Sequence, residues 1–121
     1  VWDKRDGIAS NDQSDCELAW TNRSRAVRLF RHLWQGMIKA SEKGVQRVHP
    51  TQKPVALFKW VITQMNLPSD TLIVDPYMGS GACGVAASEL GYSFLGVEIV
   101  EQYYEIAKSR IEKAFSQPIL L

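Results

Sequence analysis

Three glycines and a distant glutamate form the part of the sequence best suited to binding a nucleoside-bearing ligand. Residues 79–84 read Gly-Ser-Gly-Ala-Cys-Gly, which is the spacing G-x-G-x-x-G. Such glycines allow positive φ angles, close approach of the backbone to a ligand and tight packing of the next helix. Glu98 follows Gly79 by 19 residues, where a doubly wound fold places the carboxylate that binds ribose hydroxyls. The pattern predicts a cofactor pocket; the alternative is a structural turn with a solvated Glu98.

A second group of polar residues stands between two prolines, in the segment His49-Pro50-Thr51-Gln52-Lys53-Pro54. Proline suits the first turn of a helix, and the residues that follow have helical periodicity. The start of a helix attracts anions, so this segment is a suitable edge for a ligand with a carboxylate. A plain surface loop that leads into a helix is the alternative.

The elements around these motifs alternate between helix and strand. The β-branched run before Asp75-Pro76 predicts a buried strand, and Gly91 is suited to ending the helix after the glycines. Residues 54–65, 82–90 and 101–115 are predicted helices, and residues 71–74 and 93–97 are predicted strands. This order is typical of an α/β fold with a parallel sheet and flanking helices.

The first part of the chain has a different character. Two short strands, Cys16–Thr21 and Ala26–Phe30, are predicted around the turn Asn22-Arg23-Ser24, which makes residues 1–30 rich in β-structure. Residues 31–48 have mixed periodicity with breaks at Gly36 and Gly44. We expect an irregular basic segment there, with one helical turn.

Charge is unevenly distributed along the chain. Residues 1–60 carry a net charge of +5 and residues 61–121 a net charge of −4, within a total of +1. Between residues 23 and 53 the only acid is Glu42. Such a basic stretch predicts contacts with nucleic-acid phosphates, and an ordinary solvated face is the alternative. The candidate DNA-binding residues are Arg23, Arg25, Arg28, Arg31, Lys39, Lys43 and Arg47.

Composition argues against several other classes of protein. Cys16 and Cys83 lie in no CxxC or Cys/His pattern, so we expect free thiols and no metal site. No apolar run reaches the roughly 20 residues of a membrane span, and the start of the chain does not resemble a signal peptide. We therefore expect a cytoplasmic protein with no membrane partner.

The blocks HPTQKP, DPYMGSG and GVE, in this order, resemble the cofactor-binding half of amino-methylating DNA methyltransferases of the circularly permuted beta group. These enzymes act on adenine N6 or cytosine N4. Residues 2–22 are similar to segments of phage-type adenine methylases, which favours adenine. The resemblance implies a bacterial or phage-encoded protein and one partial, Rossmann-like methyltransferase domain over residues 1–121. Its parts would be strands of the catalytic half (1–30), a short DNA-facing or recognition segment (31–48) and the cofactor-binding half (49–121).

The resemblance also implies roles for individual residues toward S-adenosylmethionine. Glu98 would bind the ribose hydroxyls, and the glycine turn would approach the methionine end. Tyr77 stands where the family usually has Phe. The residues implied to line the site are Asp75, Pro76, Tyr77, Gly79, Ser80 and Gly81, with His49, Thr51, Gln52 and Lys53 closing over the methionine carboxylate.

One feature of the family is absent from the sequence. In the family a tetrapeptide of the Asp-Pro-Pro-Tyr type accepts hydrogen bonds from the target amine and stacks on the flipped base. No such sequence occurs in the 121 residues. We therefore expect a fragment that is inactive alone, completed by a homodimer or by a chain carrying the tetrapeptide.

The sequence leaves two alternatives to a methyltransferase. A non-catalytic module that binds S-adenosylmethionine, or one partner of a split enzyme, also accounts for the missing tetrapeptide. An NAD-dependent oxidoreductase is less favoured, because residues 75–78 separate the strand from the first glycine.

Overall fold

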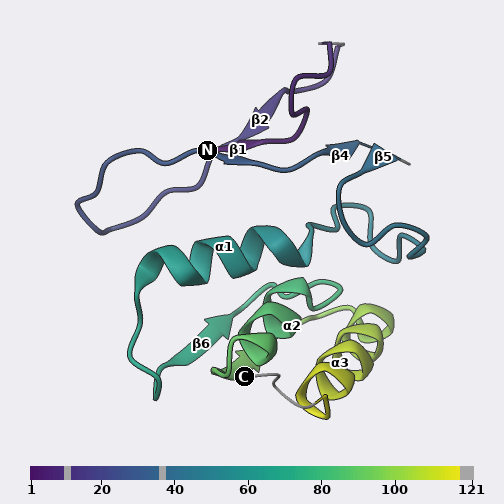
Figure 1. Ribbon diagram of the computed structural model, residues 1–121. Coiled ribbons are helices and arrows are strands. Elements are labelled where there is room, and N and C mark those ends of the chain that lie inside the picture. The colour runs from purple at the N-terminus through teal and green to yellow at the C-terminus, as the bar shows by residue number, and fades with distance from the viewer. Residues whose placement is uncertain (10–11, 36–37, 118–121) are drawn as a thin grey trace. The chain divides into compact units, whose positions relative to one another are not determined.

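The computed structural model describes residues 1–9, 12–35 and 38–117 (Figure 1). The chain forms two compact units, Val1–Val45 and Gln46–Leu121. The break that was predicted at Gly36 lies outside the described residues. Among the described residues, no helix is both long and apolar enough to cross a membrane.

The first unit consists of very short strands. Strand β1 (Trp2–Asp3) lies between β2 (Cys16–Glu17), to which it is antiparallel, and β3 (Phe30–Arg31), to which it is parallel. Strands β4 (Trp34–Gln35) and β5 (Ile38–Lys39) form a separate antiparallel pair. The Trp2 side chain is buried, and its indole N–H donates to the carbonyl of His32 at 3.0 Å.

Two predictions for this unit are wrong. The predicted strands Cys16–Thr21 and Ala26–Phe30 are reduced to two residues within β2 and the first residue of β3, and both pair with β1 rather than with each other. The expected helical turn is absent from the described residues between 31 and 48, where β4 and β5 lie instead. The first error arises because pairing with a distant N-terminal strand leaves no local periodicity to detect. The second arises because β4 and β5 pair with each other over only two residues each.

The buried Arg5 side chain holds the loop between β1 and β2. Its guanidinium donates to the carbonyls of Ala9 and Gln13, each at 2.9 Å, and forms an ion pair with Asp15. A guanidinium has five fixed N–H donors, so it can bind several loop carbonyls at once. Arg5 therefore links the described loop residues Ala9, Gln13 and Asp15 through one side chain.

The second unit begins with helix α1 (Val55–Met65), close to the predicted range. Pro54 stands at its N-cap, and Asn66 ends the helix in the left-handed region with φ 48°. Asparagine tolerates that conformation better than most residues. The buried Ile62 faces the core of the unit.

Strands β6 (Leu72–Asp75) and β7 (Ser93–Gly96) are parallel, in a register that runs from Leu72 opposite Ser93 to Asp75 opposite Gly96. Helix α2 (Ala82–Glu89) connects them, and α3 (Glu101–Phe115) follows β7. Helix α2 packs against β6, β7, α1 and α3 (Figure 1). The predicted α/β fold with a parallel sheet and flanking helices is confirmed.

The core of this unit lies between α1, α2 and one face of the two strands. Ile62, Ala86 and Ala87 form its buried centre, and Ile73 and Phe94 pack against them from the strands. The alternate strand residues are each about half exposed, namely Leu72, Val74, Leu95 and Val97. The strands were predicted to be buried, but within this unit only the face toward α2 is covered.

Substitution of Gly84 by Ala tests the close packing around α2. A Cβ atom there would lie 2.5 Å from Cδ1 of Ile111 and 2.6 Å from the ring of Phe94. Overpacking costs about 1–3 kcal/mol, more than the gain of up to about 1 kcal/mol from removing a helical glycine. We expect Gly84→Ala to lower the free energy of unfolding in urea, followed by the fluorescence of Trp60.

The matched control is Ser109→Ala, at an exposed position on α3. Ile111→Val removes the clashing Cδ1 atom. The double variant should therefore lose less free energy of unfolding than the two single variants lose together. If Gly84→Ala had the same free energy of unfolding as the wild type, the close packing around Gly84 would be contradicted.

Candidate functional site

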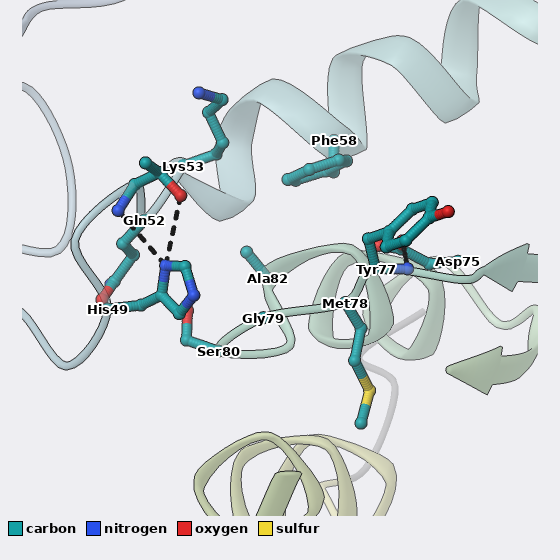
Figure 2. A pocket seen from close by; sticks show the side chains of 11 residues that line it. His49, Gln52, Lys53, Phe58, Asp75, Tyr77, Met78, Gly79, Ser80 and Ala82 are labelled. Atoms are coloured by element: carbon teal, nitrogen blue, oxygen red, sulfur yellow. Dashed lines mark hydrogen bonds between the residues drawn. The ribbon is translucent and has the colours of Figure 1, made fainter. Parts of the chain in front are cut away.

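A pocket of about 270 Å³ lies in the second unit, beyond the carboxyl end of β6. Ligands of open α/β sheets bind at this edge. In Figure 2 the rings of Phe58 and Tyr77 stand on one side of the pocket and His49 on the other. The residues that line it are His49, Thr51, Gln52, Lys53, Phe58, Asp75, Tyr77, Met78, Gly79, Ser80 and Ala82.

Most of the predicted site residues meet in this pocket, although they come from two segments of the sequence. Pro76, Gly81 and Glu98 do not line it. Sequence reasoning missed Phe58, Met78 and Ala82. The position of Phe58, one helical turn after Pro54, was a usable signal.

The HPTQ segment is a tight turn closed by its own side chains. The Gln52 N–H donates to the carbonyl of His49 at 3.2 Å, and the Thr51 N–H donates to Nδ1 of His49 at 3.2 Å. Because a backbone N–H can only donate, Nδ1 is an acceptor and the neutral ring carries its proton on Nε2. That nitrogen is 3.5 Å from where a Cβ of Gly79 would lie. The turn therefore presents an N–H donor toward the glycine segment.

Gln52 contributes less to the pocket than its position suggests. Its side chain is 8% exposed, and Oε1 accepts the Val48 N–H at 3.2 Å. Arg47, predicted to bind DNA, donates from Nε to the carbonyl of His49 at 3.1 Å. Both side chains thus hold the shape of the turn that presents His49.

The glycine turn is held by the carboxylate of Glu98. Its Oε2 accepts the Gly79 N–H and its Oε1 accepts the Val100 N–H, both at 2.9 Å. The Gly81 N–H donates to the carbonyl of Met78 at 2.8 Å. In the part of the chain that the structure describes, the Ser80 N–H has no hydrogen-bond acceptor. Ser80 therefore offers the pocket an unused backbone donor.

Asp75 and Cys83 interact beside the pocket. Burial raises the pKa of the Cys83 thiol to about 12, and the charge and hydrogen bond of the Asp75 carboxylate act in the same direction. Asp75 also accepts the Tyr77 N–H at 3.0 Å. The Tyr77 side chain is 89% exposed. Cys83 is thus a packing residue rather than a nucleophile.

The seven predicted DNA-binding cations do not belong to one compact unit. Six are in the first unit and Arg47 is in the second. Lys39 is half-buried, with its ammonium 4.5 Å from the ring centre of Trp34, and Arg31 lies 3.8 Å from the carboxylate of Asp3. The exposed ones are Arg23, Arg25, Arg28, Arg31, Lys43 and Arg47. Their contact with DNA stays a prediction.

The aromatic residues of the basic segment stack on one another. The rings of Phe30 and His32 lie 5.5 Å apart and nearly parallel, and Trp34 is tilted at 6.4 Å from His32. Burial lowers the pKa of His32. The alternating positions 30, 32 and 34 place these rings on one side of an extended segment. The residues that the structure describes contain no cluster of His, Cys, Asp and Glu able to hold a metal ion.

The fold and the pocket define a Rossmann-like protein with a pocket at the carboxyl edge of its sheet. A family model described as DNA methylase, of the N6/N4 type, matches residues 3–109. The chain therefore belongs to the N6/N4 DNA methylase family.

Individual relatives agree with this membership. The chain is 39% identical over 85 residues to the type II methyltransferase M2.LlaDCHI of Lactococcus lactis subsp. cremoris, and 35% identical over 83 residues to M2.DpnII of Streptococcus pneumoniae. Each match covers 69% of this chain and 31% of the relative, so the chain spans about a third of their length. A solved complex of M1.HpyAVI with SAM matches 76% of this chain and 42% of its own, with a TM-score of 0.56 and 29% identity.

The two cysteines provide a test of the packing beside the pocket. Cys16 is exposed and Cys83 is buried. With a pKa of about 12, only about one part in ten thousand of Cys83 is thiolate at pH 8, and the thiolate is the reactive form. We expect a thiol reagent at pH 8 to label one thiol of the folded chain and two after denaturation. The Cys16→Ser variant should stay unlabelled until it unfolds; rapid labelling of that variant would contradict the burial of Cys83.

Proposed function

We propose that this chain is the S-adenosylmethionine-binding part of a DNA amino-methyltransferase that acts on adenine N6 in preference to cytosine N4. The observation that carries the proposal is the convergence of the HPTQK and DPYMGS segments on one pocket beside Glu98. The solved relative in complex with SAM supports the choice of cofactor. The preference for adenine rests on the likeness of residues 2–22 to phage-type adenine methylases.

Glu98 is suited to bind the ribose while it holds the turn. Each carboxylate oxygen accepts one backbone N–H, from Gly79 or from Val100. A carboxylate has about four lone-pair positions, so one acceptor position remains on each oxygen. Two adjacent hydroxyl groups of a ribose match this pair of acceptors.

The opposite end of the pocket is suited to the methionine carboxylate. Helix α1 starts there without a side-chain cap and without an acid in its first turn, so no acidic side chain of that turn neutralises its positive dipole end. The Nε2–H of His49 and the N–H of Ser80 add two donors. Lys53, at the start of the helix, adds a positive charge beside the pocket.

The chain's own residues bind and orient the cofactor but do not hold the target base. S-adenosylmethionine, when bound, supplies an electrophilic methyl group on its sulfonium sulfur. Transfer requires the acceptor amine to be placed in line with that methyl group, and positioning of this kind dominates the rate. The tetrapeptide that would place the amine is missing from these 121 residues, so it must come from other sequence of the same protein or from a complementing chain.

The charge of the first unit supports DNA as the substrate. The exposed arginines of the first unit carry charge suited to phosphate contacts. The two named relatives come from bacteria, which supports action in a bacterial cytoplasm, from a bacterial or phage gene. Membership in a DNA methylase family removes the nicotinamide-dependent alternative.

Calorimetric titration tests the cofactor. We expect S-adenosylmethionine and S-adenosylhomocysteine to bind and NAD not to bind. Glu98→Gln removes the negative charge and one acceptor; hydrogen bonds to charged groups contribute about 1.5–3 kcal/mol, so binding should weaken about tenfold to a hundredfold. Glu105→Gln, an exposed acid on α3, is the matched control. Equal affinity of the Glu98→Gln and Glu105→Gln variants would refute the ribose contact.

A methyl-transfer assay tests the division of labour. With labelled S-adenosylmethionine and DNA, the lone chain should incorporate no label, because it has no group that accepts the hydrogen bonds of the target amine. Addition of a polypeptide that carries an Asp-Pro-Pro-Tyr segment of this family should restore transfer. Transfer by the lone chain would overturn the proposal, while failure of every such addition would favour the non-catalytic module.

A further inference from the structure

Helix α3 contacts both segments that form the pocket, although none of its residues lines the pocket. We propose that Tyr103 and Arg110 are positioning residues, which hold His49 and Ser80 in the arrangement that binds the cofactor. This inference rests on the function proposed above. It assigns to α3 a role in the affinity of the site rather than in folding alone.

Arg110 fixes the backbone of the glycine turn. Its Nη1 donates to the carbonyl of Ser80 at 2.6 Å, across 30 residues of sequence. That carbonyl and the N–H of Gly81 belong to one planar peptide group. Because the Gly81 N–H donates to the carbonyl of Met78 at 2.8 Å, this peptide group is held at both of its polar ends.

The neighbouring peptide groups show why this matters for binding. The group between Met78 and Gly79 is also held at both ends, through the Met78 carbonyl and through the Gly79 N–H bonded to Glu98. The Ser80 N–H lies in the peptide group between these two fixed ones. Arg110 therefore fixes the direction of the one N–H of the turn that remains available to a ligand.

Tyr103 holds the other segment. Its ring lies 4.4 Å from the ring of His49, centre to centre, at an angle of 59°. Tilted packing of this kind is favourable for aromatic pairs. Since Thr51 already occupies Nδ1 of His49, the Tyr103 contact fixes the face of the imidazole and keeps Nε2 against Gly79.

The spacing along α3 puts these contacts on one side of the helix. Positions 103, 107, 110 and 111 are related by helical repeats of three and four residues. The fully buried Ala107 lies between them, and a Cβ on Gly81 would be 3.0 Å from it. Gly81 has φ +83°, a conformation that favours glycine. The turn can therefore approach α3 closely enough for Arg110 to reach Ser80.

The contacts of α3 hold the glycine turn more firmly, but the turn does not need them in order to form. Without Arg110, the turn keeps its bonds to Glu98 and Met78 and its continuation into α2. A charge-assisted hydrogen bond is shorter and stronger than a neutral one, so its loss should loosen the Ser80 peptide group. A looser site has to be ordered on binding, which reduces affinity.

The test uses Arg110→Met and Tyr103→Leu, with Lys108→Met as the matched control because it removes an exposed cation from the same helix. Arg110→Lys and Tyr103→Phe are the conservative variants. The readouts are calorimetric affinity for S-adenosylhomocysteine and amide hydrogen exchange of the chain without ligand. Exchange reports on the turn directly, which a general loss of stability would not single out.

We expect Arg110→Met and Tyr103→Leu to weaken binding about tenfold, Arg110→Lys to recover part of the loss, and Tyr103→Phe and Lys108→Met to match the wild type. In Arg110→Met the Gly81 amide should exchange faster while the amides of α2 do not change. Affinities within twofold of the wild type, or unchanged exchange at Gly81, would overturn the inference. If the wild type binds neither S-adenosylmethionine nor its product, the proposed function fails, and the exchange data still decide whether α3 positions the turn. If Arg110→Met does not fold, Arg110→Lys and Tyr103→Leu decide the affinity.

Discussion

The hydrogen bond between the Gly79 N–H and the Glu98 carboxylate is the constraint on which the pocket depends. Parallel strands end at the same edge of a sheet, and here the pairing continues past β6 and β7 through hydrogen bonds of Val97 with Asp75 and with Met78. The chain must then turn sharply into α2, in a place where unpaired backbone groups are costly. Glu98 satisfies the first N–H of that turn. One side chain thus joins the end of the second strand to the loop after the first.

Helix α2 shows the consequence of a turn held so closely to the sheet. The helix is contacted by α1 and α3 and by both strands, so large side chains have no room on most of its surface. Gly84 and the fully buried Ala86 and Ala87 meet this demand. A helix buried on most sides has no polar stripe. The small side chains on most sides of α2 are therefore a consequence of its buried position. They also let the glycine turn lie within reach of α3.

The second unit was predictable because its signals are local. Pro54, Asp75-Pro76 and Gly91 each act on the backbone next to them, so the helices and strands begin and end within about two residues of the predicted positions. The first unit was not, since each of its strands has only two residues, and β2 and β3 pair with β1 across 13 or more positions. The motifs likewise identified most of the pocket lining. The contact of Arg110 with Ser80 depends on the angle between two helices, which no spacing in the sequence encodes.

One face of the two parallel strands is exposed within the second unit, and the two named relatives are longer than this chain. Parallel sheets are normally covered on both faces, whereas Leu72, Val74, Leu95 and Val97 are about half exposed within the second unit. The pocket volume of about 270 Å³ likewise falls just below the range of about 300–1,000 Å³ usual for small-molecule sites. Relatives are about three times longer than the matched region. The glycine turn is held within the second unit by Glu98 and by Arg110 of α3, so its geometry is local even where the cover of the sheet is not.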